Sequence, residues 1–192
     1  MGMELEWKFR TTQNQQAAVL AAFSPWQSIT METTYYDTPG KALSSRRVTL
    51  RRRMENGRSI CTVKTPAHGG ARGEWELECD FIENSIPLLC KLGAPKWIAE
   101  AVAEGLVPVC GAVFSRQACQ IGVDGTAVEI AVDFGRLFGG TKQLPLCEIE
   151  VEYKSGDKAL AAAFADQLAT RFGLEKENDS KFRRALSLAE GE

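Results

Sequence analysis

The sequence predicts a mainly β fold of the α+β class: an eight-stranded antiparallel β-barrel, closed into a tunnel, with helices packed on its outside. First, about eight segments alternate charged and apolar side chains with the period of two that is typical of strands. Second, short helices or hairpins can join all of these segments. Third, the helices between them carry apolar stripes that need a packing partner. The apolar strand faces supply that partner, which leaves the charged faces inside.

The first strand covers residues 4–9 and carries Glu4, Glu6 and Lys8 on one face, with bulky apolar residues on the other. A helix follows that Thr11 or Thr12 can cap and that ends before Pro25.

Residues 33–38 are β-rich and end in a Pro-Gly turn. Residues 46–53 are the most basic strand, and their alternation predicts that Arg47, Arg51 and Arg53 share one face.

The dipeptide Asn56-Gly57 predicts a hairpin turn into a strand over residues 59–65, which carries Lys64. After a glycine-rich loop, a strand over residues 72–78 alternates charged residues with Trp75 and Leu77. Its charged residues are Arg72, Glu74, Glu76 and Glu78.

Residues 85–105 have a helical pattern, with Gly105 as the stop. Three more strands are predicted after it. They cover residues 113–121 with Arg116, residues 126–134 with Glu129 and Asp133, and residues 146–153 with Glu148, Glu150 and Glu152.

A helix is predicted over residues 157–172, with Ser155 or Asp157 as the N-cap and Gly173 as the stop. A short basic helix follows at residues 180–186.

The composition is that of an ordinary globular protein. The chain has 192 residues, of which 44% are hydrophobic and 25% charged, and its net charge is −2. We therefore expect one domain over residues 1–192, no membrane partner and no nucleic-acid partner. Six scattered cysteines without a CxxC pair favour buried thiols over a disulfide framework or a zinc site. With no apolar leader at the N-terminus, we expect a soluble, cytoplasmic protein, and no pattern predicts its oligomeric state.

Charges of both signs on the inner faces predict a wet lumen, because an unpaired buried charge costs several kcal/mol. Convergent Lys and Arg suit phosphate oxygens, and carboxylates beside them suit a divalent cation bridging to phosphate. A polyphosphate with Mg²⁺ or Mn²⁺ would satisfy both. From alternation alone, an internal network of ion pairs without a ligand is an equal alternative.

An ordered set of motifs covers nearly the whole chain and resembles the CYTH proteins, the triphosphate tunnel metalloenzymes. The latter half is most similar to their bacterial inorganic triphosphatases. The motifs are Glu4-x-Glu6-x-Lys8, Tyr36-Asp37-Thr38-Pro39, Leu50-Arg51-Arg52-Arg53, Thr62-Val63-Lys64, Arg72-x-Glu74-x-Glu76, Val128-Glu129-Ile130-Ala131-Val132-Asp133-x-Gly135, Cys147-Glu148-Ile149-Glu150-Val151-Glu152 and Ser180-Lys181. One departure is Ala185, where relatives often have glycine.

The resemblance implies roles for the charged residues and one or two bound Mg²⁺ or Mn²⁺ ions. It implies that Glu4 and Glu6 bind metal together with Glu148 and Glu150 across the tunnel, with Glu76, Glu129 and Asp133 as weaker candidates. It also implies that Lys8, Arg51, Arg53 and Lys64 bind phosphate and take part in catalysis. Further phosphate contacts are implied for Arg72, Arg116, Lys181 and Arg184.

The reaction implied is hydrolysis of inorganic triphosphate to diphosphate and phosphate. Thiamine triphosphate hydrolysis, nucleoside triphosphate hydrolysis and class IV-type adenylate cyclisation use the same tunnel and are alternatives. A further alternative is a non-catalytic module that binds polyphosphate or an RNA 5′ end, which would not require the acidic residues.

Overall fold

The computed structural model of the chain describes residues 2–66 and 72–191, and side chains from residues 5–66 and 73–191. In these residues ten strands form one sheet in the order β1-β6-β5-β4-β3-β7-β8-β9-β2-β10, and each neighbouring pair is antiparallel. The strands are β1 (Gly2–Glu4), β2 (Glu6–Arg10), β3 (Gln27–Asp37), β4 (Thr49–Glu55), β5 (Arg58–Lys64), β6 (Arg72–Glu78), β7 (Val107–Val123), β8 (Thr126–Gly139), β9 (Lys142–Ser155) and β10 (Glu175–Lys176). The predicted fold class, a mainly antiparallel β-structure with external helices, is confirmed.

Five helices and two 3₁₀ turns accompany the sheet in the described residues. They are α1 (Gln13–Ala22), α2 (Ile82–Lys91), α3 (Trp97–Ala101), α4 (Lys158–Phe172) and α5 (Lys181–Glu190), with η1 (Ser44–Arg46) and η2 (Val102–Glu104). None of them is long and apolar enough to cross a membrane.

The ends of the sheet meet in the N-terminal segment. β1 pairs with β6 and β2 pairs with β9, and only Leu5 separates the two strands. The carbonyl of Leu5 still accepts a hydrogen bond from the Tyr153 amide at 2.9 Å. The sheet of the described residues has ten strands rather than the predicted eight, and hydrogen bonds between strands do not close it. In these residues only the chain itself, passing from β1 to β2, links its two sides.

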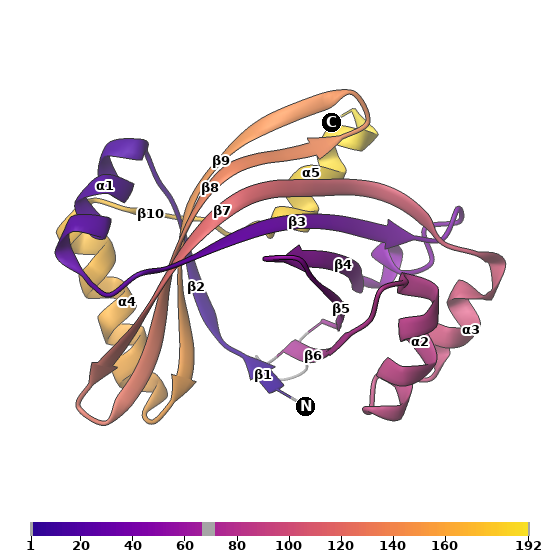
Figure 1. The fold of residues 1–192 in the computed structure, drawn as a ribbon, viewed down its shortest axis with the longest axis horizontal. Coiled ribbons are helices and arrows are strands. Elements are labelled where there is room, and N and C mark those ends of the chain that lie inside the picture. The colour runs from indigo at the N-terminus through magenta and orange to yellow at the C-terminus, as the bar shows by residue number, and fades with distance from the viewer. Residues whose placement is uncertain (1, 67–71, 192) are drawn as a thin grey trace.

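Helices cover the outer apolar faces at two places, as the alternation predicted (Figure 1). α2 and α3 pack over β4, β5 and β6, where Leu50, Val63 and Trp75 form a core with Ile86 and Ile98. On the other side, α1 and α4 cover β2, β8 and β9 in a second apolar core.

Unlike the other helices, α5 packs under the arch that β7, β8 and β9 form, against the inner faces of these strands. In Figure 1 it is seen behind them. Its Ala185 is fully buried among Tyr35, Phe114 and Leu137, with Phe182 packed against the same cluster. This end of the enclosed space is therefore apolar, whereas the alternation predicted charges along the whole interior.

The basic strand predicted at residues 46–53 begins later than expected. Residues 44–46 form η1, and Arg47 adopts a left-handed conformation with φ 57°, so β4 starts at Thr49. Arg46 instead places its guanidinium 4.6 Å from the centre of the Trp97 ring. Arg47 is exposed and does not join Arg51 and Arg53 on the inner face.

Several local signals are confirmed. Thr12 caps α1 with a capping box and Asp157 caps α4, each one of the two predicted candidates. Ser180 caps α5, which was not predicted. Asn56 and Gly57 form the β4–β5 turn with positive φ angles of 48° and 87°. The helical pattern predicted over residues 85–105 is divided into α2, α3 and η2, and β3 and β7 each start six residues before their predicted starts at 33 and 113.

Candidate functional site

A cavity of about 310 Å³ lies inside the sheet, and its lining is dominated by charged side chains. Charged lining residues come from β2, β4, β5, β6, β7, β8 and β9 and from the start of α5. They are Glu6, Lys8, Arg51, Arg53, Glu55, Lys64, Glu74, Glu76, Arg116, Glu129, Glu150, Glu152, Lys154 and Lys181. Because strands alternate their faces, residues two apart on each strand reach this space together.

The basic wall of the cavity is formed by β4 and β5. The Arg53 Nε donates to Thr33 Oγ1 at 3.2 Å, and its Nη1 lies 3.3 Å from Glu55 Oε1. Glu74 Oε1 lies 3.8 Å from Arg51 Nη2 and 3.3 Å from Lys64 Nζ. Each of these cations is thus paired with a carboxylate. An anion with more negative charge than a carboxylate would attract them more strongly and could take its place.

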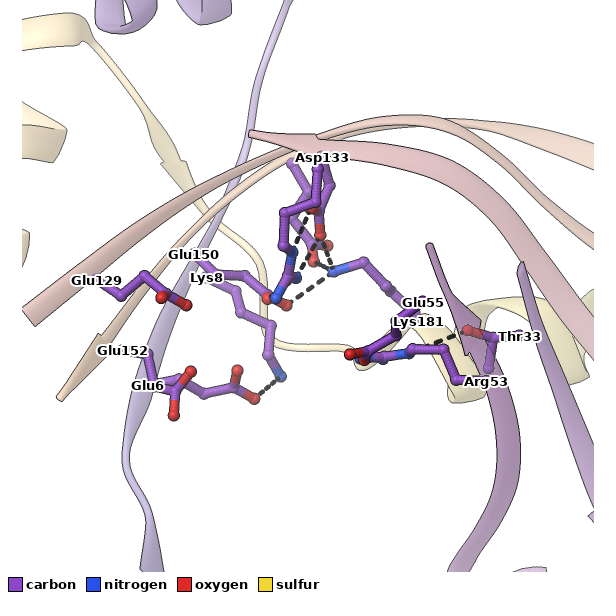
Figure 2. Close-up of polar contacts among 12 residues, drawn as sticks. Glu6, Lys8, Thr33, Arg53, Glu55, Glu129, Asp133, Glu150, Glu152 and Lys181 are labelled. Atoms are coloured by element: carbon purple, nitrogen blue, oxygen red, sulfur yellow. Dashed lines mark hydrogen bonds and ion pairs between the residues drawn. The ribbon is translucent and has the colours of Figure 1, made fainter. Parts of the chain in front are cut away.

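A second wall combines β2, β9 and β8. Lys8 Nζ lies 3.0 Å from Glu6 Oε1, and Glu6 stands opposite Glu152 in the strand register. Glu152 in turn stands opposite Glu129, and Lys154 Nζ lies 2.8 Å from Glu152 and 3.4 Å from Glu129. Figure 2 shows Glu6, Glu129 and Glu152 gathered in one region of the site. Two lysines therefore accompany three carboxylates here.

A buried acidic trio, formed by Asp133, Glu148 and Glu150, lies deeper in the site. One carboxylate oxygen from each residue lies within 4.8 Å of the others, and Asp133 and Glu148 are fully buried. The Lys181 ammonium contacts Glu148 and lies 2.8 Å from Asp133 and 2.7 Å from Glu150 (Figure 2). The trio therefore already surrounds one positive charge.

Two guanidinium groups complete the pairing of the acidic trio. Arg116 binds Asp133 through two hydrogen bonds of 2.7 Å and reaches Glu150 at 2.5 Å. Arg184 contacts Glu148. Arg184 also lies 3.4 Å from Glu177. Every carboxylate of the trio is therefore paired with at least one cation, which offsets the cost of burying it.

These surroundings shift the pKa values of the site. Burial raises the pKa of Glu148 to about 7, although the Lys181 ammonium acts in the opposite direction. Burial also acts against ionised Glu150, but Lys181 and Arg116 outweigh it and hold the pKa of Glu150 well below its usual range. Burial and the charges of Arg51 and Arg116 lower the pKa of Arg53.

A buried glutamine fixes the backbone behind the acidic trio. Gln16 on α1 donates through Nε2 to the carbonyls of Asp133 at 2.8 Å and Glu148 at 3.3 Å. The burial of Gln16 could have been predicted from the sequence. Gln16 lies three, four and seven residues before Val19, Leu20 and Phe23, so it falls on the apolar face of the helix. The helical stripe alone marks Gln16 as inward-facing.

The structure brings together most of the residues that the resemblance implied. Lys8, Arg51, Arg53, Lys64, Arg116, Lys181 and the acidic residues Glu6, Glu76, Glu129 and Glu150 line the cavity. Glu148, Asp133 and Arg184 stand behind it in the ion-pair network. The side chains of Glu4 and Arg72 are not among those that the structure describes. The backbone pairing of β1 with β6 places the two residues opposite each other.

The strand register places Glu6 apart from Glu148 and Glu150, although the resemblance implied that the three bind metal together. Glu6 stands opposite Glu152, whereas Glu150 stands opposite Lys8 and Glu148 stands opposite Arg10. Glu74, Glu152 and Lys154 were missed as site residues, although the same alternation placed Glu74 and Glu152 on inner faces. Only the register reveals which of these charges meet.

Comparisons with known proteins agree with this geometry. A CYTH domain family model matches residues 2–186 of the chain. The chain is similar to an inorganic triphosphatase from Haemophilus influenzae, with 26% identity over 164 residues, which covers 84% of this chain and 47% of that relative. The chain thus spans about half the length of the curated relative that it matches.

Solved structures share the fold at low sequence identity. A Hippeastrum protein, described as an adenylyl cyclase candidate with a dominant triphosphatase activity, has a TM-score of 0.67, 19% identity and 96% coverage of both chains. An adenylate cyclase candidate from Bacillus halodurans has a TM-score of 0.62, 14% identity and coverage of 95% and 96%. A Pyrococcus horikoshii protein has a TM-score of 0.61, 20% identity and coverage of 96% and 98%.

Proposed function

The chain belongs to the CYTH domain family, and from this membership we propose that it is a triphosphatase whose preferred substrate is inorganic triphosphate. Residues 1–192 would act as one catalytic domain. The observation that carries the proposal is the cavity inside the sheet, in which Lys and Arg from several strands converge together with carboxylates. A module that only bound anions would gain nothing from these carboxylates, because they repel phosphate.

The residues present fit a divalent cation. The acidic trio offers three carboxylate oxygens within 4.8 Å of one another, and it already holds the positive charge of Lys181. Hard oxygen ligands of this kind suit Mg²⁺ or Mn²⁺. Glu148 and Glu150, with Asp133, would hold one ion. Glu6, which the register places opposite Glu152, would hold a second ion together with Glu4, since the resemblance implies one or two ions. When bound, such an ion neutralises phosphate oxygens and lowers the pKa of a coordinated water.

The basic residues would bind and orient the triphosphate. Arg51, Arg53 and Lys64 on one wall and Lys8 on the other would exchange their carboxylate partners for phosphate oxygens. Held in this way, the terminal phosphoryl group is open to in-line attack by water. The new P–O bond forms as the bond to the leaving diphosphate breaks, and one proton of the water is released. The arginines stabilise the charge that builds up on the transferring group and on diphosphate.

The test measures phosphate release from tripolyphosphate, thiamine triphosphate and ATP with Mg²⁺ or Mn²⁺. We expect tripolyphosphate to be hydrolysed fastest, and Glu6→Gln to lose metal-dependent turnover by about 10²-fold or more. Glu32→Gln is the matched control, because Glu32 is exposed and is absent from the cavity lining. Binding of tripolyphosphate without turnover would instead identify a binding module. Diphosphate and cyclic AMP formed from ATP would identify a cyclase.

A further inference from the structure

The acidic trio and Lys181 together make an unusual arrangement for a metal site. Lys181 lies within 2.8 Å of Asp133 and 2.7 Å of Glu150 and also contacts Glu148, so its ammonium occupies the space between the three carboxylates. Only 7% of the Lys181 side chain is exposed. A second cation cannot enter the same space while this ammonium is present, because two positive charges would meet where water is excluded.

We infer that Lys181 is a resident cation that competes with the divalent metal for the acidic trio, and that metal binding moves Lys181 toward the phosphate-binding space. This inference rests on the proposed metal-dependent function and adds a regulation of the same site. Lys181 can make this move because it lines the cavity as well as contacting the trio. It is the first residue of α5, so its side chain can swing while the rest of the helix stays packed.

The competition between Lys181 and the metal also changes the net charge around the acidic trio. With Lys181 in place, the three carboxylates of the trio face Lys181 and Arg116, and they share Arg184 with Glu177, which lies 3.4 Å from the Arg184 Nη1. Exchange of the lysine for a divalent ion gives the cluster one more positive charge and also frees an ammonium. Both changes favour a phosphate anion nearby, so metal and phosphate should strengthen each other's binding. The lysine therefore makes metal binding weak until phosphate arrives.

The direct test is Mn²⁺ binding measured by calorimetry without substrate. We expect Lys181→Gln to bind Mn²⁺ about tenfold more tightly than the unaltered protein, because no ammonium has to be displaced. Lys176→Gln is the charge-matched control, since Lys176 and its partner Asp166 are exposed at the surface. Lys154→Gln is the second comparison, because Lys154 pairs with Glu129 and Glu152.

The outcomes are distinct. Unchanged or weaker Mn²⁺ binding by Lys181→Gln, in a protein whose unaltered form hydrolyses triphosphate, would overturn the competition alone. Tighter binding by Lys154→Gln instead would overturn it in favour of the Glu129–Glu152 region. An unaltered protein that neither binds Mn²⁺ nor hydrolyses triphosphate would overturn the proposed function itself.

A second measurement keeps the inference testable if Lys181→Gln fails to fold. In the unaltered protein, acetylation of each lysine by an N-hydroxysuccinimide ester is followed by mass spectrometry with and without Mn²⁺. Lys181 should resist acetylation when its ammonium is buried and ion-paired, and Mn²⁺ should increase its acetylation several-fold. Lys176 should show no change, and equal protection of Lys181 in both conditions would contradict the displacement.

Discussion

At the scale of single residues, three consecutive arginines on β4 have two different environments. Arg51 and Arg53 line the cavity, whereas the Nε of Arg52 donates to Ser59 Oγ at 2.8 Å and Arg52 does not line it. Under the proposed function, we expect Arg53→Gln to lower kcat/KM for triphosphate by about 10²-fold, because it removes a positive charge from the cavity wall proposed to bind phosphate. Arg52→Gln should leave kcat/KM nearly unchanged. Phosphate release measures both, and equal losses would contradict the assignment of faces.

Two buried thiols give a pH dependence that can be measured. Burial raises the pKa of Cys61 to about 11 and that of Cys110 to about 12, from an ordinary value of 9.0. In the unfolded chain these thiols ionise near pH 9, so the folded state holds their protons longer and its stability falls as the pH rises from about 9 to 11. Melting temperatures across this range should decline, and less steeply in a Cys61→Ala, Cys110→Ala variant.

The same two thiols should also be chemically inert. Because their thiolates are scarce at pH 8, we expect iodoacetamide to leave Cys61 and Cys110 unmodified in the native protein and to label them after denaturation. Peptide mapping by mass spectrometry checks this expectation. Rapid labelling of Cys110 in the native state would mean that its cover by α5 opens readily, since its Sγ lies 3.9 Å from the Phe182 carbonyl oxygen.

Alternation in the sequence was sufficient to predict which way most site residues face. Glu6, Lys8, Arg53 and Glu150 were all placed on inner faces, and all line the cavity. Their ion-pair partners could not be predicted in this way, because a partner depends on the register between strands that are distant in sequence. The contact of Arg116 on β7 with Glu150 on β9, which is 34 residues further along the chain, is an example.

At the scale of elements, the loop after β3 depends on one buried carboxylate. Asp37 Oδ1 accepts from the amides of Thr38 at 2.7 Å and Leu43 at 2.9 Å, and Oδ2 accepts from the Ser44 amide at 3.0 Å. The motif Tyr36-Asp37-Thr38-Pro39 thus has a structural part in holding the chain that leads into η1 and β4.

We expect Asp37→Ala to destabilise the protein by about 3 kcal/mol, because it leaves buried amides without an acceptor. Asp37→Asn should cost less, since one oxygen remains to accept. Urea unfolding gives the free energies, with Asp166→Ala on the exposed side of α4 as the control. A loss of less than about 1 kcal/mol in Asp37→Ala would show that these hydrogen bonds do not hold the loop.

Element types were predictable from local patterns, whereas several boundaries were not. Asn56-Gly57 was enough to place the β4–β5 turn, because few dipeptides tolerate two positive φ angles. The start of β4 was not predictable, since Arg46 leaves the expected strand to stack on Trp97. That contact joins η1 to α3, and no local pattern contains both.

At the scale of the whole molecule, ligand binding should be visible as added stability. If Mn²⁺ and a triphosphate bind only the folded state, a ligand concentration of 100 times Kd adds about 2.7 kcal/mol to the free energy of unfolding. For a protein of this size the melting temperature should rise by about 5–10 °C. Scanning fluorimetry with each ligand alone and with both together measures this rise. An unchanged melting temperature with both ligands would contradict binding inside the cavity.

Which elements meet to form the site was the least predictable feature of the molecule. The acidic trio forms where β8 and β9 pair, and the buried Lys181 comes from α5, which begins more than thirty residues after Glu148. Alternation predicted the strands, and only the resemblance pointed to Lys181, as a phosphate contact; its pairing with the acidic trio was not predicted. The apolar cluster beneath the arch had no such signal, because Tyr35, Phe114 and Leu137 read like ordinary core residues.

That apolar cluster bounds the charged cavity on one side. Tyr35 belongs to the cluster and Phe182 packs against it, and both also line the cavity, so the charged lining gives way to apolar side chains where α5 packs. Under the proposed function, a long linear polyphosphate would place only a terminal segment among the cations of this cavity. Tripolyphosphate would then be cleaved faster than longer chains, and the diphosphate left behind would leave past the same charged walls.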